Sequence, residues 1–319
     1  MVILLEAANP DDSNILSIVG TLLYDLFGYR LAAAFSFKTR LTAGNPPADL
    51  TLELAAEPLL PIPFGPPLYR SPLTSLFHSN GREVLRFLDA GDFLIQDDRI
   101  EVFLERTRLD LAELRFLGPV FSYWLERRGL TTLHASAVAV NGQGVAFLSR
   151  HGGGKSGLAA AMVRAGHPLL TDDLLAVEET GDHWKVQPSY PEMRMWPDEA
   201  AWFAGSIEDL PFVQTDSEKR RVEIGPFQES PAPLSRIYVA SRRPETEGGI
   251  EIQPLSRSEA LIELVRHSFS PRLMEAAGLQ PARLDRLARL VRSVPVHRLV
   301  YPTGFDRLPL VVASIIKSL

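Results

Sequence analysis

The sequence predicts an α/β fold in which a smaller β-rich domain precedes a larger domain of alternating strands and helices. Three patterns support this: apolar and polar residues alternate over 48–105, helical spacing follows over 110–129, and 143–178 reads strand, glycine-rich loop, helix, strand. At 319 residues the chain is long enough for two domains. We expect a variable leader (1–28), a β-rich domain with its linking helix (29–128) and the larger domain (129–319).

The composition narrows the classes of function. Hydrophobic residues make up 45% of the chain and charged residues 23%, which is ordinary for a globular protein. The net charge of −6 disfavours nucleic acid or an anionic membrane as a partner. The absence of cysteine excludes disulfides, thiolate metal sites and cysteine nucleophiles. Because no targeting segment or bilayer-length apolar run is visible, we predict a cytoplasmic protein.

Strand patterns fill the first domain. Residues 48–54, 82–98 and 99–105 alternate apolar with polar side chains, and turn-forming sequences such as Asn80-Gly81 separate them. Residues 110–129 then carry apolar side chains at helical spacing, as expected of a helix that links or packs the two halves. We expect the aromatic residues of this helix to lie in a core rather than to contact a ligand.

The second domain begins with a regular succession of elements. Asn141-Gly142 is the pair that two-residue hairpin turns favour. In chain order the prediction is a strand (134–140), this turn, a buried strand (145–149), a glycine-rich loop (150–156), a helix ended by Gly166 (157–166) and a strand (168–179). Because the helix has only about ten residues, we expect a tight βαβ-like unit.

The loop sequence SRHGGGKS, residues 149–156, ends as a phosphate-binding loop does, although Ser149 stands where the usual pattern has glycine. Such a loop holds phosphate oxygens with backbone N–H groups and a helix N-terminus, and neither requires that first glycine. Gly152, Gly153 and Gly154 allow the chain to turn tightly and to approach the phosphates closely.

The residues after the glycines carry the chemistry. Lys155 would neutralise the phosphates of ATP, and the Ser156 hydroxyl would be a ligand of Mg²⁺. Together with the three glycines and Gly157, they form the predicted nucleotide site. The alternative is a glycine-rich turn with no ligand.

Two acids follow closely, Asp172 lying 17 residues after Lys155. Because side chains alternate along a strand, we expect Asp172 and Asp173 to point in opposite directions. One would face the phosphates, and the other would reach Mg²⁺ through water or meet a structural partner. The alternative is a pair that caps a turn.

Residues 132–173 (TLHASAVAVNGQGVAFLSRHGGGKSGLAAAMVRAGHPLLTDD) resemble the catalytic core of the HPr kinase/phosphorylase family. The order and spacing of His134, Lys155, Gly166-His167 and the two acids match. Residues 190–198 (YPEMRMWPD) resemble the family's signature loop, with Glu192 and Arg194 in register. The resemblance extends over about 134–315, more loosely beyond Asp198.

Within the family the chain is most similar to HPr-kinase-related proteins encoded beside peptide-modification genes. The shared features are a β-rich N-terminal domain, the LHASAV strand, the YP…WPD segment and a short basic stretch at Lys219-Arg220. Some of these proteins phosphorylate a serine of lasso-peptide precursors, so this resemblance implies a peptide substrate.

The resemblance also implies roles for matching residues. It makes Asp172 the general base, places His134 beside it and assigns support of the metal to Asp173 and Glu192, with Lys155 and Ser156 in the roles given above. Met195-Trp196 follow Arg194 where the family has glycine, a difference that indicates a substrate other than HPr.

Candidate substrate contacts follow Glu192 in the chain. Met195 and Trp196 suit a groove for a flexible peptide, with filling of the core as the alternative for Trp196. Arg194 and a mobile loop at Lys219, Arg220 and Arg221 would bind a carboxylate or a phosphate, since arginine binds such groups bidentately. The alternative for the loop is a solvated run of charge.

Two further patterns receive structural interpretations. Residues 282–294 predict an amphipathic helix with Leu284 and Leu287 inside and a solvated face that includes Arg283. His267, like the other histidines outside the matching core, shows no metal-ligand spacing and is assigned no role.

The sequence thus predicts an ATP- and Mg²⁺-dependent kinase that phosphorylates a serine hydroxyl on a peptide or small protein, such as a lasso-type precursor. Three alternatives stay open: an HPr(Ser) kinase/phosphorylase, a kinase of free serine or another small hydroxyl metabolite, and a non-catalytic nucleotide-binding regulatory protein. The joint presence of Ser156, Asp172 and Glu192 argues against the last. Whether the chain forms a homo-oligomer is left open.

Overall fold

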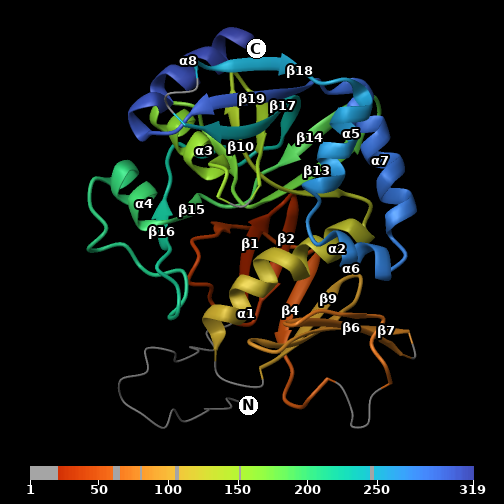
Figure 1. Cartoon of the computed structure of the whole chain (residues 1–319). Helices are drawn as coiled ribbons and strands as arrows, with labels where there is room; N and C mark the ends of the chain where they lie inside the picture. Colours follow the sequence, from red (N-terminus) through yellow and green to blue (C-terminus); the bar gives the residue numbers. More distant parts are fainter. Residues whose placement is uncertain (1–20, 60–64, 80, 105–107, 151, 245–247) are drawn as a thin grey trace. The chain divides into compact units, whose positions relative to one another are not determined.

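The structure is a computed structural model that describes residues 21–59, 65–79, 81–104, 108–150, 152–244 and 248–319 (Figure 1). The chain divides into two compact units, Met1–Trp124 and Leu125–Leu319. Most of the predicted leader lies outside the described residues. Its last part is a strand, Leu22–Leu26, which pairs antiparallel with Tyr29–Ala33 through a turn at Phe27 and Gly28, both of positive φ. Residues 22–28, which the prediction placed in the leader, thus belong to the sheet of the first unit.

A single sheet forms the first unit. Among the described residues its strands pair in the order β3-β1-β2-β4-β9-β8-β7-β6-β5. Their bounds are Leu22–Leu26 (β1), Tyr29–Ala33 (β2), Thr42–Ala43 (β3), Leu50–Leu54 (β4), Tyr69–Arg70 (β5), Thr74–Ser79 (β6), Arg82–Phe87 (β7), Gly91–Ile95 (β8) and Arg99–Phe103 (β9). The predicted strands are confirmed, and alternate residues such as Ile100 and Val102 are buried as a half-buried strand requires.

The predicted helix over 110–129 is present but not uniform. It consists of α1 (Leu109–Arg115), a π-helical turn (Phe116–Val120) and α2 (Phe121–Arg127). Pro119 lies in the π-helical turn, where its missing N–H interrupts the α-helical hydrogen bonding. Phe116, Phe121 and Trp124 are at most 1% exposed, which confirms the expected core role of these aromatic residues.

The second unit is built on an eight-stranded sheet in the order β11-β10-β13-β14-β17-β19-β18, with β12 paired to β10, as far as the described residues show. β11 also pairs in parallel with β17, so the strands from β11 to β17 in this order form a closed ring of pairings. The bounds are Thr131–Val140 (β10), Gln143–Leu148 (β11), Leu169–Thr171 (β12), Leu174–Thr180 (β13), His183–Gln187 (β14), Ala232–Arg243 (β17), Glu251–Pro254 (β18) and Val296–Pro302 (β19). β15 (Glu192–Met195) and β16 (Arg220–Glu223) form a separate antiparallel pair.

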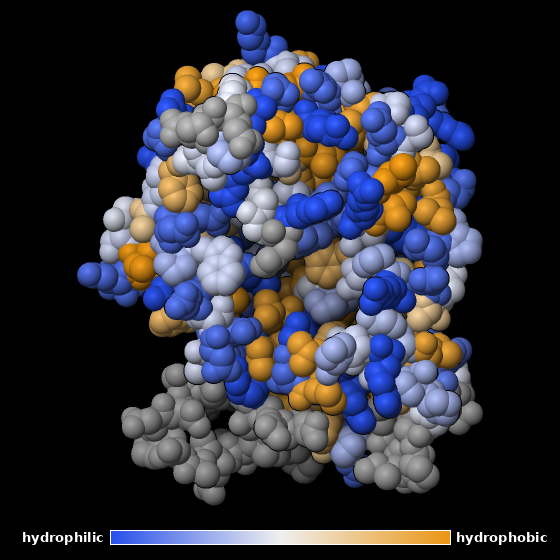
Figure 2. Space-filling view, in the orientation of Figure 1, coloured by the Kyte–Doolittle hydropathy of each residue, from blue (hydrophilic) through white to orange (hydrophobic). Residues whose placement is uncertain are grey.

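Helices enclose two cores around this sheet (Figure 1). One core contains Leu158 and Met162 of α3 with Val311 and Ile315 of α8, and the other contains residues of α5 and α7 such as Leu264. The helix bounds are Lys155–Arg164 (α3), Pro197–Ala204 (α4), Arg257–Arg266 (α5), Pro271–Ala276 (α6), Gln280–Ser293 (α7) and Leu308–Ser318 (α8). Hydrophilic and hydrophobic residues are interspersed over the outer face of this unit in Figure 2.

The predicted order of elements from 134 to 179 is confirmed. Asn141 and Gly142 have φ values of 51° and 77°, as a two-residue hairpin turn between β10 and β11 requires. β11 and β12 are both antiparallel to β10, so they run parallel to each other with α3 connecting them. Within the described part of the chain no helix is long and apolar enough to cross a membrane.

The buried face of α7 differs from the prediction. Arg283, expected to be solvated, is fully buried, and Leu284, expected inside, is 39% exposed. The reason is a buried carboxylate: Glu126 Oε1 accepts a hydrogen bond from Arg283 Nε at 2.8 Å, and Glu126 Oε2 accepts one from Arg286 Nη2 at 2.7 Å. The guanidinium takes the inner position because this acid needs a partner there.

Candidate functional site

The glycine-rich loop joins β11 to α3. Gly154, directly before α3, has a φ of 91°, and a Cβ atom there would lie 2.5 Å from Tyr301 Oη. Gly152 has a φ of 74°, and its carbonyl oxygen accepts a hydrogen bond from Arg242 Nη2. A side chain at either position would be strained or would clash, so the loop depends on its glycines.

The first turn of α3 is open to an anion. No side chain among the described residues caps its N-terminus, so the leading N–H groups of the helix stay available and its dipole favours negative charge. Gly153 is used within the loop, since its N–H donates to Arg150 O at 2.8 Å. Gly157 faces α4, where a Cβ atom would lie 3.4 Å from Glu199 Oε1.

Both predicted acids meet the start of α3. Lys155 Nζ lies 2.8 Å from Asp173 Oδ1, and Ser156 Oγ donates a hydrogen bond of 3.0 Å to Asp172 Oδ1. The expectation that the carboxylates point in opposite directions is wrong. The two residues form a bend between β12 and β13, where Asp173 has a φ of 63°, so strand alternation does not apply.

The two carboxylate oxygens of Asp172 differ in their hydrogen bonding. It is 3% exposed, and its Oδ1 accepts hydrogen bonds from Ser136 Oγ and Ser156 Oγ. Its Oδ2 is buried without a hydrogen-bond partner in the described part of the chain. Because buried polar atoms are nearly always paired, this oxygen is ready to bind a metal ion or to accept a proton from a hydroxyl group.

The ion pair between Lys155 and Asp173 favours the charged form of both groups. Burial raises the pKa of Asp173, but the positive charge of Lys155 outweighs it, and the net pKa lies well below the usual range. Burial lowers the pKa of Lys155, but the attraction of Asp173 and then Asp172 leaves its net pKa raised. Asp173 is therefore a weak proton acceptor, suited to holding positive charge.

His134 contacts the acids through the backbone. Its Nδ1 lies 3.0 Å from Asp173 O, and its backbone N–H donates to His267 O at 2.8 Å. Burial, followed by the charge of Lys155, lowers the pKa of His134, so the imidazole is neutral at neutral pH. The resemblance implies a place beside Asp172; the ring contacts the neighbouring residue instead.

The segment that resembles the signature loop is β15. Glu192 is 4% exposed, and Met193 and Met195 are buried in the core that contains α3, so Met195 is not available to a peptide groove. Arg194 is near enough to Asp173 to help lower the pKa of that carboxyl. In the described residues no three carboxylate or imidazole side chains are grouped closely enough to hold a metal by themselves.

The basic stretch is the beginning of β16 rather than a mobile loop. Arg221 is 5% exposed, and its Nη2 donates to Val213 O at 3.0 Å, so it does not serve a ligand at the surface. Arg220 lies over the Phe212 ring, 3.4 Å from its centroid. Trp196 is 41% exposed, with Lys219 Nζ 5.3 Å from its ring centroid. Trp196 is therefore a surface residue and not a core filler.

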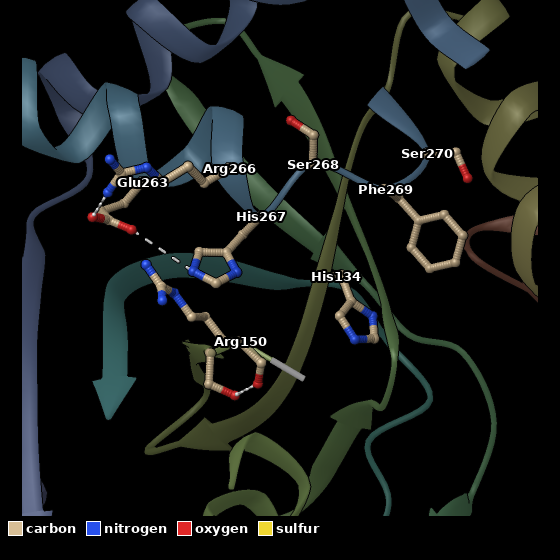
Figure 3. Close-up of a pocket in the computed structure, with 9 residues that line it drawn as sticks. His134, Arg150, Glu263, Arg266, His267, Ser268, Phe269 and Ser270 are labelled. Atoms are coloured by element: carbon tan, nitrogen blue, oxygen red, sulfur yellow. Dashed lines mark hydrogen bonds and ion pairs between the residues drawn. The ribbon is translucent and has the colours of Figure 1, made fainter. Parts of the chain in front are cut away.

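Two pockets flank the loop, and they contain Arg150, Glu263 and His267, which the sequence did not predict as site residues. A pocket of about 630 Å³ is lined by His134, Ser149, Arg150, Phe269 and the end of α5 (Figure 3). A second, of about 450 Å³, is lined by Gly152, Gly153 and residues 239–242 and 298. Arg150, Glu263 and His267 line both. Of these residues only Arg150 could have been found from the sequence, because it lies inside the glycine-rich loop. His267 reaches the pockets from the end of α5, which is distant from the loop in sequence.

The chain was compared with known proteins. No family model matches it. The HPr kinase/phosphorylase of Caldanaerobacter subterraneus subsp. tengcongensis is 33% identical over 107 residues, which are 32% of this chain and 35% of the relative. The chain thus spans about a third of the length of this curated relative. The match shows a distant relationship to HPr kinase/phosphorylase and does not distinguish a subgroup.

A structural comparison gives a partial likeness. The HPr(Ser) kinase/phosphatase from Coxiella burnetii has a TM-score of 0.31 to this chain and 12% sequence identity. The match covers 59% of this chain and 94% of the other.

Proposed function

We propose that the protein transfers the γ-phosphate of ATP, with Mg²⁺, to a serine hydroxyl of a peptide or small protein. The observation that carries this proposal is the double pairing of Lys155 with Asp173 and of Ser156 with Asp172 at the open start of α3. Two cation-binding acids and two phosphate-loop residues lie within hydrogen-bonding distance of one another. A glycine-rich turn without a ligand has no need of this arrangement.

The residues fit a magnesium ion. Mg²⁺ prefers oxygen ligands and keeps several from water and phosphate, so it does not need a cage of protein side chains. The Ser156 hydroxyl supplies such an oxygen, and the carboxylates of Asp173 and Glu192 supply negative charge for the ion nearby. When bound, the ion would neutralise charge on the phosphates.

Each catalytic role follows from a contact. Lys155 leaves Asp173 for the β- and γ-phosphates, while the N–H groups at the start of α3 bind their oxygens. Asp172 Oδ2 accepts the proton of the serine hydroxyl as its oxygen bonds to the γ-phosphorus. The bond from that phosphorus to the bridging oxygen breaks, and ADP leaves. His134 supports the bend that carries the acids through its contact with Asp173 O.

The acceptor is proposed from the subgroup resemblance and from Trp196. An exposed tryptophan beside Lys219 suits a flexible peptide, and some of the resembling proteins phosphorylate lasso-type precursors. Arg194 and Arg220 are further candidates for acceptor contacts. Free serine and HPr stay as alternative acceptors.

One experiment tests the kinase proposal and ranks the acceptors. The protein is incubated with Mg²⁺ and ATP labelled at the γ-phosphate, in parallel with peptides encoded beside its gene, HPr and free serine. We expect label on a peptide serine, and none with Asp172→Asn. Nucleotide binding without transfer to any acceptor would favour the non-catalytic regulatory protein. A protein that binds no nucleotide would exclude both the kinase and the nucleotide-binding regulatory protein.

A further inference from the structure

The proposed function assigns no ligand to the larger pocket beside the loop. His134 of β10, Arg150 of the loop and His267 at the end of α5 lie around one space in Figure 3. Its volume of about 630 Å³ is in the range of pockets that bind small molecules or a few residues of a peptide. The pocket therefore has room for a small molecule or for a few residues of a peptide or protein acceptor.

The two pockets adjoin different strands of the sheet, and Arg150, Glu263 and His267 line both. The loop strand β11 has β10 on one side and β17 on the other. The larger pocket includes His134 of β10, whose ring contacts Asp173 O, so it adjoins the acids. The smaller pocket includes the end of β17 together with Gly152 and Gly153 of the phosphate loop. An acceptor in the larger pocket would therefore lie beside the acids of the site.

Positive charge in the larger pocket is not balanced. Glu263 is its acidic residue, and Arg266 Nη1 lies 2.8 Å from that carboxylate. The guanidinium of Arg150 has no hydrogen-bond or ion-pair partner among the residues that the structure describes. Burial lowers the pKa of both His134 and His267, so the imidazoles add no charge at neutral pH. The lining therefore favours a single negative charge.

Hydrogen bonds to buried groups fix the part of the pocket lining formed by Ser268 and Phe269. Ser268 lines the pocket, and its hydroxyl accepts a hydrogen bond from Arg283 Nη1. Arg283 Nη2 donates to Thr132 O at 2.6 Å, and Phe269 N–H donates to the same oxygen at 3.3 Å. A wall fixed by a buried arginine is preorganised, which lowers the cost of binding a small group.

We infer that this pocket binds a carboxylate of the acceptor and that Arg150 is the residue that binds it. The inference rests on the proposed kinase function and narrows its substrate class to hydroxyl compounds with a carboxylate near the target hydroxyl. Arginine suits the task because its planar fork matches a carboxylate. A phosphate dianion would need more positive charge than the lining provides.

The carboxylate has two sources, the end of a chain or an acidic side chain, and three probes distinguish them. N-acetylserine has a terminal carboxylate, the blocked dipeptide Ac-Ser-Asp-NH2 has one on a side chain, and N-acetylserinamide has none. Their affinities are measured by ligand-observed NMR on the full chain with Mg²⁺ and a non-hydrolysable ATP analogue. The proteins are wild type, Arg150→Gln, Arg150→Lys and Arg272→Gln, a matched charge change at an exposed arginine outside both pockets.

We expect at least one carboxylate probe to bind about tenfold or more tightly than the amide, as a charge-assisted hydrogen bond implies. Arg150→Gln should bring that probe to the level of the amide, Arg150→Lys should retain part of the difference, and Arg272→Gln should retain all of it. If neither carboxylate binds more tightly than the amide, or if Arg150→Gln preserves the difference, the inference is wrong.

A separate measurement of nucleotide binding tests the kinase proposal. The thermal shift of each variant with Mg²⁺-ATP reports folding and nucleotide binding without any acceptor. The probes are also titrated without nucleotide. If the wild type shows no thermal shift with Mg²⁺-ATP but still prefers the carboxylate probes, the proposed kinase function is wrong. Carboxylate binding by the pocket would then still stand.

Discussion

Lys155 Nζ and Asp173 Oδ1 lie 2.8 Å apart, so the cation of the phosphate loop is held by an acid of the same site. The pair stabilises the charged form of both groups: the pKa of Asp173 is lowered and that of Lys155 is raised. Under the proposed function, a phosphate that bound to the loop would take the place of this carboxylate. In that case Asp173 would hold Lys155 in position until the phosphate binds.

The first prediction concerns nucleotide binding. Mg²⁺-ATP at about 100 times its Kd should stabilise the wild type by about 2.7 kcal/mol through ligand linkage, and a thermal melt should show this as a higher Tm. Lys155→Ala should lose most of the shift because it removes the cation that meets the phosphates. Lys185→Ala, on β14 away from the loop, should keep it. An unchanged shift in Lys155→Ala would mean that the nucleotide binds elsewhere.

The second prediction separates the two acids. Asp172→Asn should lower kcat on the order of 10²- to 10⁴-fold with Mg²⁺-ATP affinity nearly intact, because Asp172 Oδ2 is the oxygen without a partner in the described residues. Asp173→Asn should mainly weaken the dependence on Mg²⁺, because its lowered pKa makes it a poor base. Steady-state kinetics over a magnesium titration measures both. The opposite pattern would exchange the two roles.

Local patterns predicted the strand, loop and helix of the site, because 3.6- and 2-residue periods, an Asn-Gly turn and a glycine triplet are read from neighbouring residues. The direction of the acids was not predictable in this way, since it depends on the positive φ of Asp173. Arg283 was misread for another reason. Its partner, Glu126, is distant in sequence, and helical periodicity does not reveal which charge is neutralised inside a core.

The third prediction concerns that buried pair. Glu126 and Arg283 are both fully buried at their side chains, and Arg283 also donates to Ser268 Oγ and Thr132 O. Its removal leaves three buried acceptors each short of a charged donor, with Arg286 still paired to Glu126 Oε2. Arg283→Met should lower the free energy of unfolding by about 3–5 kcal/mol, measured by urea denaturation. Arg292→Met, an exposed arginine on the same helix, should change it by less than about 0.5 kcal/mol. A small effect of Arg283→Met would mean that Arg286 alone is enough to neutralise Glu126.

The fourth prediction concerns acid sensitivity. Burial lowers the pKa of His267, so the unfolded chain binds a proton at a higher pH than the folded chain does. The stabilisation that His267 contributes is present at pH values above its pKa in the unfolded chain, which is about 6.5. It is lost as the pH falls toward the lowered pKa of His267 in the folded chain. The free energy of unfolding should therefore decrease between about pH 6.5 and 5, and His267→Gln should reduce that slope. His183→Gln, at an exposed site, is the matched control for the substitution itself. A slope as steep in His267→Gln as in the wild type would refute a buried neutral His267.

The last prediction concerns the acceptor. Trp196 is 41% exposed at the start of α4, and Lys219 lies over its ring, so its indole presents both an apolar face and a nearby cation to solvent. If a peptide docks there, Trp196→Ala should raise the acceptor KM by about tenfold and leave kcat nearly unchanged, because truncation of a docking contact removes uniform binding. Mg²⁺-ATP affinity and Tm should stay near wild type, since little buried surface is lost. Leu284→Ala, which shortens a comparably exposed apolar residue on α7, controls for truncation at the surface. A joint loss of Tm and ATP affinity would instead make Trp196 a support for α4, and an unchanged KM would place the peptide elsewhere on the protein.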